Sequence, residues 1–255
     1  MKRLFGCLAL VVLGVAVACG PISDGKPTTA ASDAVVANDN QHAVCTLKNG
    51  VLTVALEART GVWQPEGEGG GTLTVAAFGE PGKPMSTPGP VIRVSVGTKV
   101  HATIRNTLDK PLIVLGFGKT RGISDSSIVP TGGTSELEFT ATTAGTFYYV
   151  ARRTPDGSTG RDLRDSQLHG FIVVDSVNAP PGSHERLMAI SWANVVDPKS
   201  KTGIEMGTMD INGLSWPHTE RLEYMQGDSV HWRVVNFTGI DHPMHLHGFY
   251  FRVES

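Results

Sequence analysis

Short segments of alternating apolar and polar residues recur along the chain, separated by turns rich in Gly and Pro. Residues 51–58 alternate in this way, and residues 91–96 and 100–106 form two more strand-like segments, joined by the turn Gly97-Thr98-Lys99. Further β-prone segments lie at 72–78, 135–140, 146–151, 170–175 and 187–192. A period of two places alternate side chains in a core, whereas no long stretch has the helical period. The pattern predicts an all-β chain of Greek-key β-sandwich type.

This β pattern occurs twice. Residues 224–248 align without a gap with residues 94–118 after a shift of 130, the difference between Gly97 and Gly227. A strand histidine and a strand-end asparagine also match in this register: His101 with His231, and Asn106 with Asn236. Two copies of one fold explain the match. We therefore predict two β-sandwich domains, at residues 43–177 and 184–255, with a Pro-containing linker between them.

Composition agrees with this organisation. The 255 residues include 30 Gly and 15 Pro, which suits a turn-rich β protein. The length allows two domains of about 100 residues each after a leader is removed. A net charge of -2 gives no reason to expect a nucleic-acid partner.

The first residues have the features of an export signal. A positively charged start is followed by an apolar run at residues 4–17, too short to span a bilayer, which takes about 20 residues. Ala16-Val17-Ala18-Cys19 resembles a bacterial lipobox with Cys19 as the lipidated residue, and ordinary cleavage at an A-x-A site is the alternative. We expect a signal at 1–19, a flexible linker at 20–42, and a lipid-anchored protein in the periplasm or at the cell surface.

The other cysteines and the arginines indicate no further site. Cys7 leaves with the signal, and Cys45 is expected to be a structural or free thiol, so no disulfide framework is predicted. One arginine-rich segment is interleaved with acidic residues, which favours a solvated loop with local ion pairs over an anion site. Its residues are Arg152, Arg153, Arg161 and Arg164 with Asp156, Asp162 and Asp165. The single histidines His101, His169 and His231 are expected to be structural.

Three of the nine histidines fall within six residues, in His242-Pro243-Met244-His245-Leu246-His247. If residues 245–247 lie on a strand, the side chains of His245 and His247 point to the same face. Two adjacent imidazoles suit a borderline transition metal such as copper or zinc, and not calcium or magnesium. The alternative is a set of surface histidines on an edge strand.

Together with Gly248, these residues resemble the H-P-x-H-L-H-G copper motif of multicopper oxidases, the laccase-like family of cupredoxin domains. The resemblance implies copper as cofactor, with His242 on the type 1 copper, His245 on the type 2 copper and His247 on the type 3 pair. It also implies an oxidoreductase that takes electrons from a small-molecule reductant and passes them to dioxygen. Residues 88–94, Pro-Gly-Pro-Val-Ile-Arg-Val, resemble the family's P-G-P-x-I-x-V segment. Both sandwiches are therefore expected to be cupredoxin-like.

The family's other copper ligands are missing from this sequence. Where the family has its first-domain histidines, the chain has Leu115, Phe117, Val150 and Arg152. A type 1 site also needs a cysteine thiolate, and no cysteine follows Cys45. We therefore expect a first domain without copper ligands and a chain that is inactive by itself. A non-catalytic copper-binding or copper-resistance protein is the alternative function, and a structural β-sandwich without metal is the third.

The second copy of the repeat is shorter than the first. It stops at Ser255, whereas the first copy runs on from Gly118 to about Asp175. We expect the second domain to be incomplete and the reading frame to continue for at least about 50 residues. The family resemblance implies an H-C-H segment just past position 280, 130 residues after Val150. Residues 249–253 would otherwise be left as an unpaired apolar edge. A homo-oligomer is compatible with these features.

Overall fold

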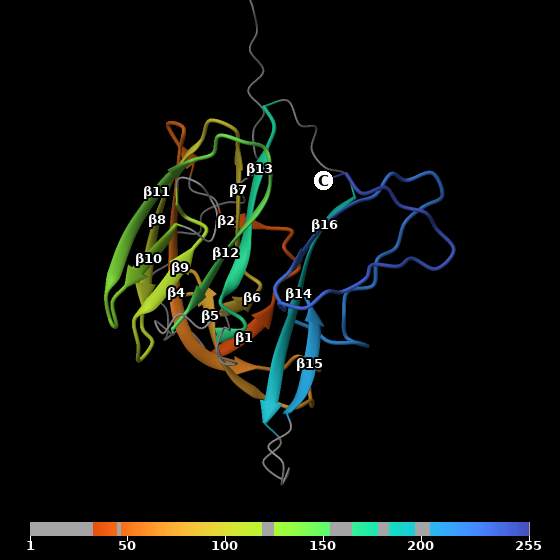
Figure 1. Ribbon diagram of the computed structural model, residues 1–255, viewed down its shortest axis with the longest axis horizontal. Coiled ribbons are helices and arrows are strands. Elements are labelled where there is room, and N and C mark those ends of the chain that lie inside the picture. Colours follow the sequence, from red (N-terminus) through yellow and green to blue (C-terminus); the bar gives the residue numbers. More distant parts are fainter. Residues whose placement is uncertain are drawn as a thin grey trace, which may run out of the picture.

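The computed structural model describes residues 33–44, 47–118, 125–153, 165–177, 184–196 and 205–254. Every named element in these ranges is a β-strand, as the alternation predicted. Two sheets pack face to face as one sandwich, and a third sheet lies beside them (Figure 1). The expected signal at 1–19 with Cys19, and the thiol of Cys45, fall outside the described residues. Within these ranges, no helix is long and apolar enough to cross a membrane.

Each sheet combines strands that are distant in the sequence. The first has the order β1 (Ala34–Ala37), β6 (Met85–Thr87), β5 (Leu73–Gly79), β4 (Val51–Trp63), β8 (Lys99–Asn106) and β11 (Thr134–Thr140), with β3 (Leu47–Lys48) beside β4. The second has the order β10 (Ser126–Val129), β9 (Leu112–Leu115), β12 (Gly145–Arg152), β13 (His169–Asp175), β7 (Gly89–Ser95) and β2 (Ala43–Val44). The third has the order β15 (Glu205–Ile211), β14 (Glu185–Val196) and β16 (His231–Asn236).

The main core lies between the first two sheets because their strands alternate. The buried positions of β4 on this face are Leu52, Val54, Leu56 and Ala58. From the second sheet, the ring of Tyr149 reaches into the core, with its centroid 5.3 Å from those of Phe78 and Phe117. The Tyr149 hydroxyl donates to the Pro90 carbonyl at 2.7 Å, so its polar end is paired while its ring links the two sheets.

The N-terminal boundary differs from the prediction. Residues 20–42 were expected to be a flexible linker, but β1 lies within them and pairs in parallel with β6 and β4. Val35 is only 5% exposed and packs with Trp63 and Met85. The short Ala-Val-Val-Ala segment has too few residues for a clear period, and its stability comes from the sheet edge that β6 offers. The ordered first domain therefore includes residues 33–42, ahead of the predicted start at 43.

The third sheet reproduces part of the first. β14 pairs in parallel with β16 and antiparallel with β15, as β4 pairs in parallel with β8 and antiparallel with β5. The side chain of Asn236 donates to the carbonyl of residue 240 at 2.6 Å, and that of Asn106 donates to the carbonyl of residue 110 at 2.9 Å. The turns at Gly97 and Gly227 also share a positive φ, of 92° and 100°. The 130-residue repeat is thus visible in strand pairing, in hydrogen bonds and in backbone conformation.

The second copy forms one sheet within the described residues, and not a two-sheet sandwich. Residues 221–225 and 237–254, which include the histidine motif, lie in no strand. In the first copy, the segment equivalent to the motif is β9, which is held between β10 and β12. No described strand pairs with the motif in the second copy, so residues 242–248 lack the ladder partners that hold β9. The side chains of Phe249, Tyr250 and Val253 are exposed.

The third sheet packs on the outer face of the second sheet. Leu187 and Phe237 form an apolar cluster with Val91, Phe171 and Val173. The ring of Phe237 stacks on that of His169 with centroids 4.1 Å apart, and Nδ1 of His169 lies 2.9 Å from the Ser166 carbonyl oxygen. His169 is fully buried in this contact. This placement agrees with its predicted structural role.

An ion cluster lies beside that apolar contact. Nε and Nη2 of Arg93 both lie 2.8 Å from the carboxylate of Asp175, and Nη1 lies 2.5 Å from Glu185 on β14. Arg233 on β16 contacts the other oxygen of Glu185 at 2.6 Å. Burial alone would raise the pKa of Glu185, but hydrogen bonds from Arg233 and Arg93 hold it below its ordinary value. The cluster therefore joins the second and third sheets through a carboxylate that is kept ionised.

Candidate metal centre

The loop that carries the histidine motif begins with a hydrogen-bonded turn. Oδ1 of Asn236 accepts from the backbone N–H of Thr238 at 2.9 Å, while its side-chain amide closes the turn on the Ile240 carbonyl. Asn and Thr stabilise such turns because their side chains bond to nearby backbone groups. The end of β16 thereby sets the position at which the motif starts, at His242.

His242 is held by that turn. Its Nε2 lies 2.8 Å from the Thr238 hydroxyl, and the side chain is half-buried. One ring nitrogen is thus already in a hydrogen bond, which leaves Nδ1 as its other donor position for a metal.

His245 and His247 lie next to each other. Their ring centroids are 4.8 Å apart with an angle of 86° between the planes, and both residues are exposed. The sequence predicted this adjacency from a strand, but the residues lie in irregular chain and turn. Their adjacency therefore comes from the local path of the loop, and the strand from which it was argued is not formed.

The donor set suits copper only in part. Two imidazoles are ligands that copper accepts readily, and the pair is adjacent and open to solvent. Among the described residues, however, no group of three or more His, Cys, Asp or Glu side chains is placed to hold a metal ion. His242 therefore does not complete a set with His245 and His247. The structure brings two of the three predicted ligands together and supplies a pair of donors.

The first domain has filled the equivalent positions with other side chains. Leu115 and Phe117 are buried in place of the motif's second and third histidines. Val150 lies opposite Leu115 in the β12–β9 ladder, so the two segments that carry ligands in the family are neighbours here. Neither a hydrocarbon side chain nor the guanidinium of Arg152 is a metal ligand. These four positions therefore offer no copper ligand.

The structure buries one charged pair that the sequence placed in a solvated loop. Arg153 and Asp165 were assigned to a solvated loop, but both are buried, with Nε and Oδ1 2.5 Å apart. The signal was present in the alternation of β12, where Tyr149 and Ala151 point inward, so that residue 153 follows on the same face. The ion pair was predicted and its burial was not. Asp156, Arg161, Asp162 and Arg164 lie outside the described residues.

A family comparison covers the segment that contains the motif. Residues 189–255, which contain all three histidines, match the sequence model described as multicopper oxidase. This segment of the chain is therefore similar to multicopper oxidases. The predicted family resemblance and the cupredoxin-type all-β fold are confirmed.

Solved multicopper oxidases and copper nitrite reductases share the fold of this chain. A blue copper oxidase from Nitrosomonas europaea has a TM-score of 0.57 at 19% identity, over 73% of this chain and 61% of the oxidase. A copper nitrite reductase from the same organism has a TM-score of 0.57 at 22% identity, over 75% of this chain and 69% of the reductase.

A curated protein also shows sequence similarity. It is a "probable nitrite reductase-hydroxylamine oxidoreductase fusion protein" of Kuenenia stuttgartiensis, 27% identical over 178 residues, which is 64% of this chain and 21% of that protein. The chain therefore spans about a fifth of this relative.

Proposed function

We propose that this chain binds copper through His245 and His247 and belongs to an oxidoreductase that moves electrons from a small-molecule reductant to dioxygen. The observation that carries the proposal is the pair of adjacent imidazoles, 4.8 Å apart, inside the segment that matches the family. Copper at this pair would supply a redox-active metal bound by borderline nitrogen ligands. By the family motif, His242 is assigned to a separate copper.

The chain's own residues would position and expose these donors. Asn236 and Thr238 fix the start of the loop and hold the ring of His242. His245 and His247 remain open to solvent, where a metal ion or further ligands can reach them. The first domain contributes its fold and no ligand, because Leu115 and Phe117 face the core.

A non-catalytic copper-binding or copper-resistance role is the second candidate. It is favoured by the missing first-domain ligands and by the exposure of the ring pair, which suits metal uptake and release. Nitrite is an alternative electron acceptor to dioxygen, because two of the similar proteins are described as nitrite reductases.

The location and assembly are further parts of the proposal. Lipidation at Cys19 would anchor the protein to a membrane, facing the periplasm or the cell surface. A homo-oligomer would let a second copy supply copper ligands that the described residues of one chain lack. Cys19→Ser should move the protein from the membrane fraction to the soluble fraction if the anchor exists, and an unchanged distribution would favour ordinary secretion.

Electron paramagnetic resonance on the copper-loaded chain distinguishes the candidate functions. In the oxidoreductase, a phenolic reductant should remove the Cu(II) signal and dioxygen should restore it. Recovery with nitrite under anaerobic conditions, and not with dioxygen, would favour the reductase. A Cu(II) signal that the reductant does not change would favour the non-catalytic protein, and a chain that retains no copper after dialysis, measured by mass spectrometry, would contradict copper binding.

A further inference from the structure

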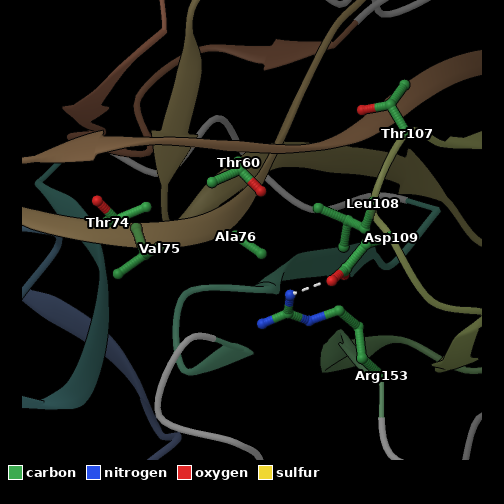
Figure 2. Close-up of a pocket in the computed structure, with 8 residues that line it drawn as sticks. All are labelled: Thr60, Thr74, Val75, Ala76, Thr107, Leu108, Asp109 and Arg153. Carbon is green, nitrogen blue, oxygen red and sulfur yellow. Dashed lines mark hydrogen bonds and ion pairs between the residues drawn. The ribbon is translucent and has the colours of Figure 1, made fainter.

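A cavity of about 320 Å³ lies in the first domain, and none of its lining residues belongs to the histidine motif. It lies between β4, β5, the loop after β8 and the residue that follows β12 (Figure 2). Val75, Ala76 and Leu108 give it buried apolar walls, and Thr60 and Thr74 add exposed hydroxyl-bearing side chains. The cavity therefore combines apolar surface with a few polar groups, as small-molecule sites commonly do.

Arg153 is the positively charged group of this cavity, and Asp109 is the negatively charged one. Arg153 is 9% exposed, and Figure 2 shows its guanidinium reaching across below Ala76. Asp165 fixes the inner side of Arg153, because its two oxygens accept from Nε at 2.5 Å and from the backbone N–H at 2.7 Å. The guanidinium is thus held in place by a buried partner, and the orientation of its outer end is fixed.

The outer end of the guanidinium is not fully paired. Nη2 is buried and has no hydrogen-bond partner in the structure as far as it is described. Among the described residues, Nη1 contacts Asp109, whose Oδ1 lies 3.3 Å away and whose side chain is 74% exposed. An unpaired buried donor is costly and is expected to be matched by an acceptor. The Asp109 contact is long and solvated, so it is easily displaced.

We propose that this cavity binds a short aliphatic carboxylate, whose two oxygens accept from Nη1 and Nη2 of Arg153. A planar carboxylate matches two parallel guanidinium N–H groups, and the alkyl part would lie against Val75, Ala76 and Leu108. Asp109 would turn into solvent when the ligand binds. A doubly charged tetrahedral anion fits less well because Asp109 and Asp165 already place two negative charges near one positive charge. The proposal is independent of copper and of the proposed function.

Calorimetric titration of the full chain with butyrate at low salt tests the proposal, with inorganic phosphate as the comparison. We expect saturable butyrate binding and weaker phosphate binding. Asp109→Asn removes the competing carboxylate and should tighten butyrate binding about 2- to 5-fold, the range of an exposed ion pair. Glu136→Gln removes an equally exposed charge on β11 and should leave binding unchanged. This pair of variants spares the buried ion pair, so folding is not at risk.

Arg153→Lys keeps the charge but loses the paired donors, so butyrate binding should fall at least about tenfold. Should this variant not fold, the Asp109→Asn result decides the question by itself. The proposal is overturned by an absence of saturable butyrate binding, by phosphate binding as tight as butyrate binding, or by an Asp109→Asn variant that binds no tighter than the native chain.

Discussion

Asp210 shows how one buried side chain can set the pH response of the molecule. It is 2% exposed, and it contacts the Ser191 hydroxyl and accepts from the Gly213 N–H at 2.8 Å. Burial raises its pKa from 3.8 to about 6, although both hydrogen bonds oppose the rise. The Ser191 hydroxyl also lies 3.1 Å from the acceptor Oε1 of Gln167. A protonated Asp210 would donate to Ser191 and leave the serine proton for Gln167.

The raised pKa predicts a stability that falls with rising pH. The folded state holds the Asp210 proton more tightly than the unfolded state, so its contribution is complete below about pH 4 and is lost as pH rises through about 6. The shift corresponds to at most about 3 kcal/mol. Urea unfolding between pH 4.5 and 7.5 measures it, with Asp210→Asn as the comparison. Asn keeps both contacts and cannot ionise, so the free-energy difference between variant and native chain should grow in favour of Asn over this range. A constant difference would contradict the assignment.

At the scale of elements, the repeat uses one turn in two environments. Asn106 is fully buried, and its side-chain amide reaches the carbonyls of Lys110, Val129 and Pro130. Asn236 makes the equivalent bond to Ile240 but is exposed. The same Asn in the same turn therefore donates hydrogen bonds to three carbonyls in the first domain and to one carbonyl in the second.

This difference predicts unequal costs for one substitution. Asn106→Ala leaves the buried Leu108 N–H without its acceptor and removes the side-chain bonds to the Lys110 and Val129 carbonyls, so it should lower the free energy of unfolding by about 2–4 kcal/mol. Asn236→Ala lets water replace its bond and should cost less than about 1 kcal/mol. Denaturant unfolding of the two variants measures both values. Equal costs would show that burial does not control the contribution of this turn.

The elements that the sequence predicted are those whose signal is local. β4 was predicted because its alternating apolar residues bury one face against a core. β1 was missed because four residues among Ala, Ser and Asp carry no period, and the β6 edge that orders them is about 50 residues away in the chain. Residues 245–247 form no strand for a related reason, since a strand needs ladder partners that a local motif cannot supply. The rings of His245 and His247 are adjacent, as expected, but they lie on a loop and not on a strand.

At the scale of the whole molecule, the two copies of the fold are held together by apolar packing and by the charge cluster around Glu185. Phe237 packs on His169 and Phe171 from the second sheet. Beside it, Glu185 joins Arg93 and Arg233, which come from different copies. Removal of the carboxylate would leave two half-buried guanidinium groups facing each other, which is more costly than the loss of an exposed ion pair.

Glu185→Gln should therefore loosen the third sheet from the first sandwich. We expect a loss of about 2 kcal/mol and faster amide hydrogen exchange in β14 and β16 at neutral pH. Because the pKa of Glu185 is lowered in the folded state, this contribution is present above its ordinary pKa and is lost as pH falls through the lowered value. Glu220→Gln, which breaks the more exposed Arg186–Glu220 pair, is the matched control and should change little. Equal exchange rates in the two variants would show that the Glu185 cluster does not hold the third sheet to the first sandwich.

The central claim is that the pair His245 and His247 holds copper, and copper content per chain tests it most directly. The full chain is loaded with Cu(II), dialysed and measured by mass spectrometry, as are the His245→Ala/His247→Ala variant and a His231→Ala control. His231 is an exposed histidine outside the motif, so its removal tests whether any surface imidazole suffices. We predict stoichiometric copper in the native chain and the control, and loss of that copper in the double variant. A double variant that retains the native copper content would contradict the account.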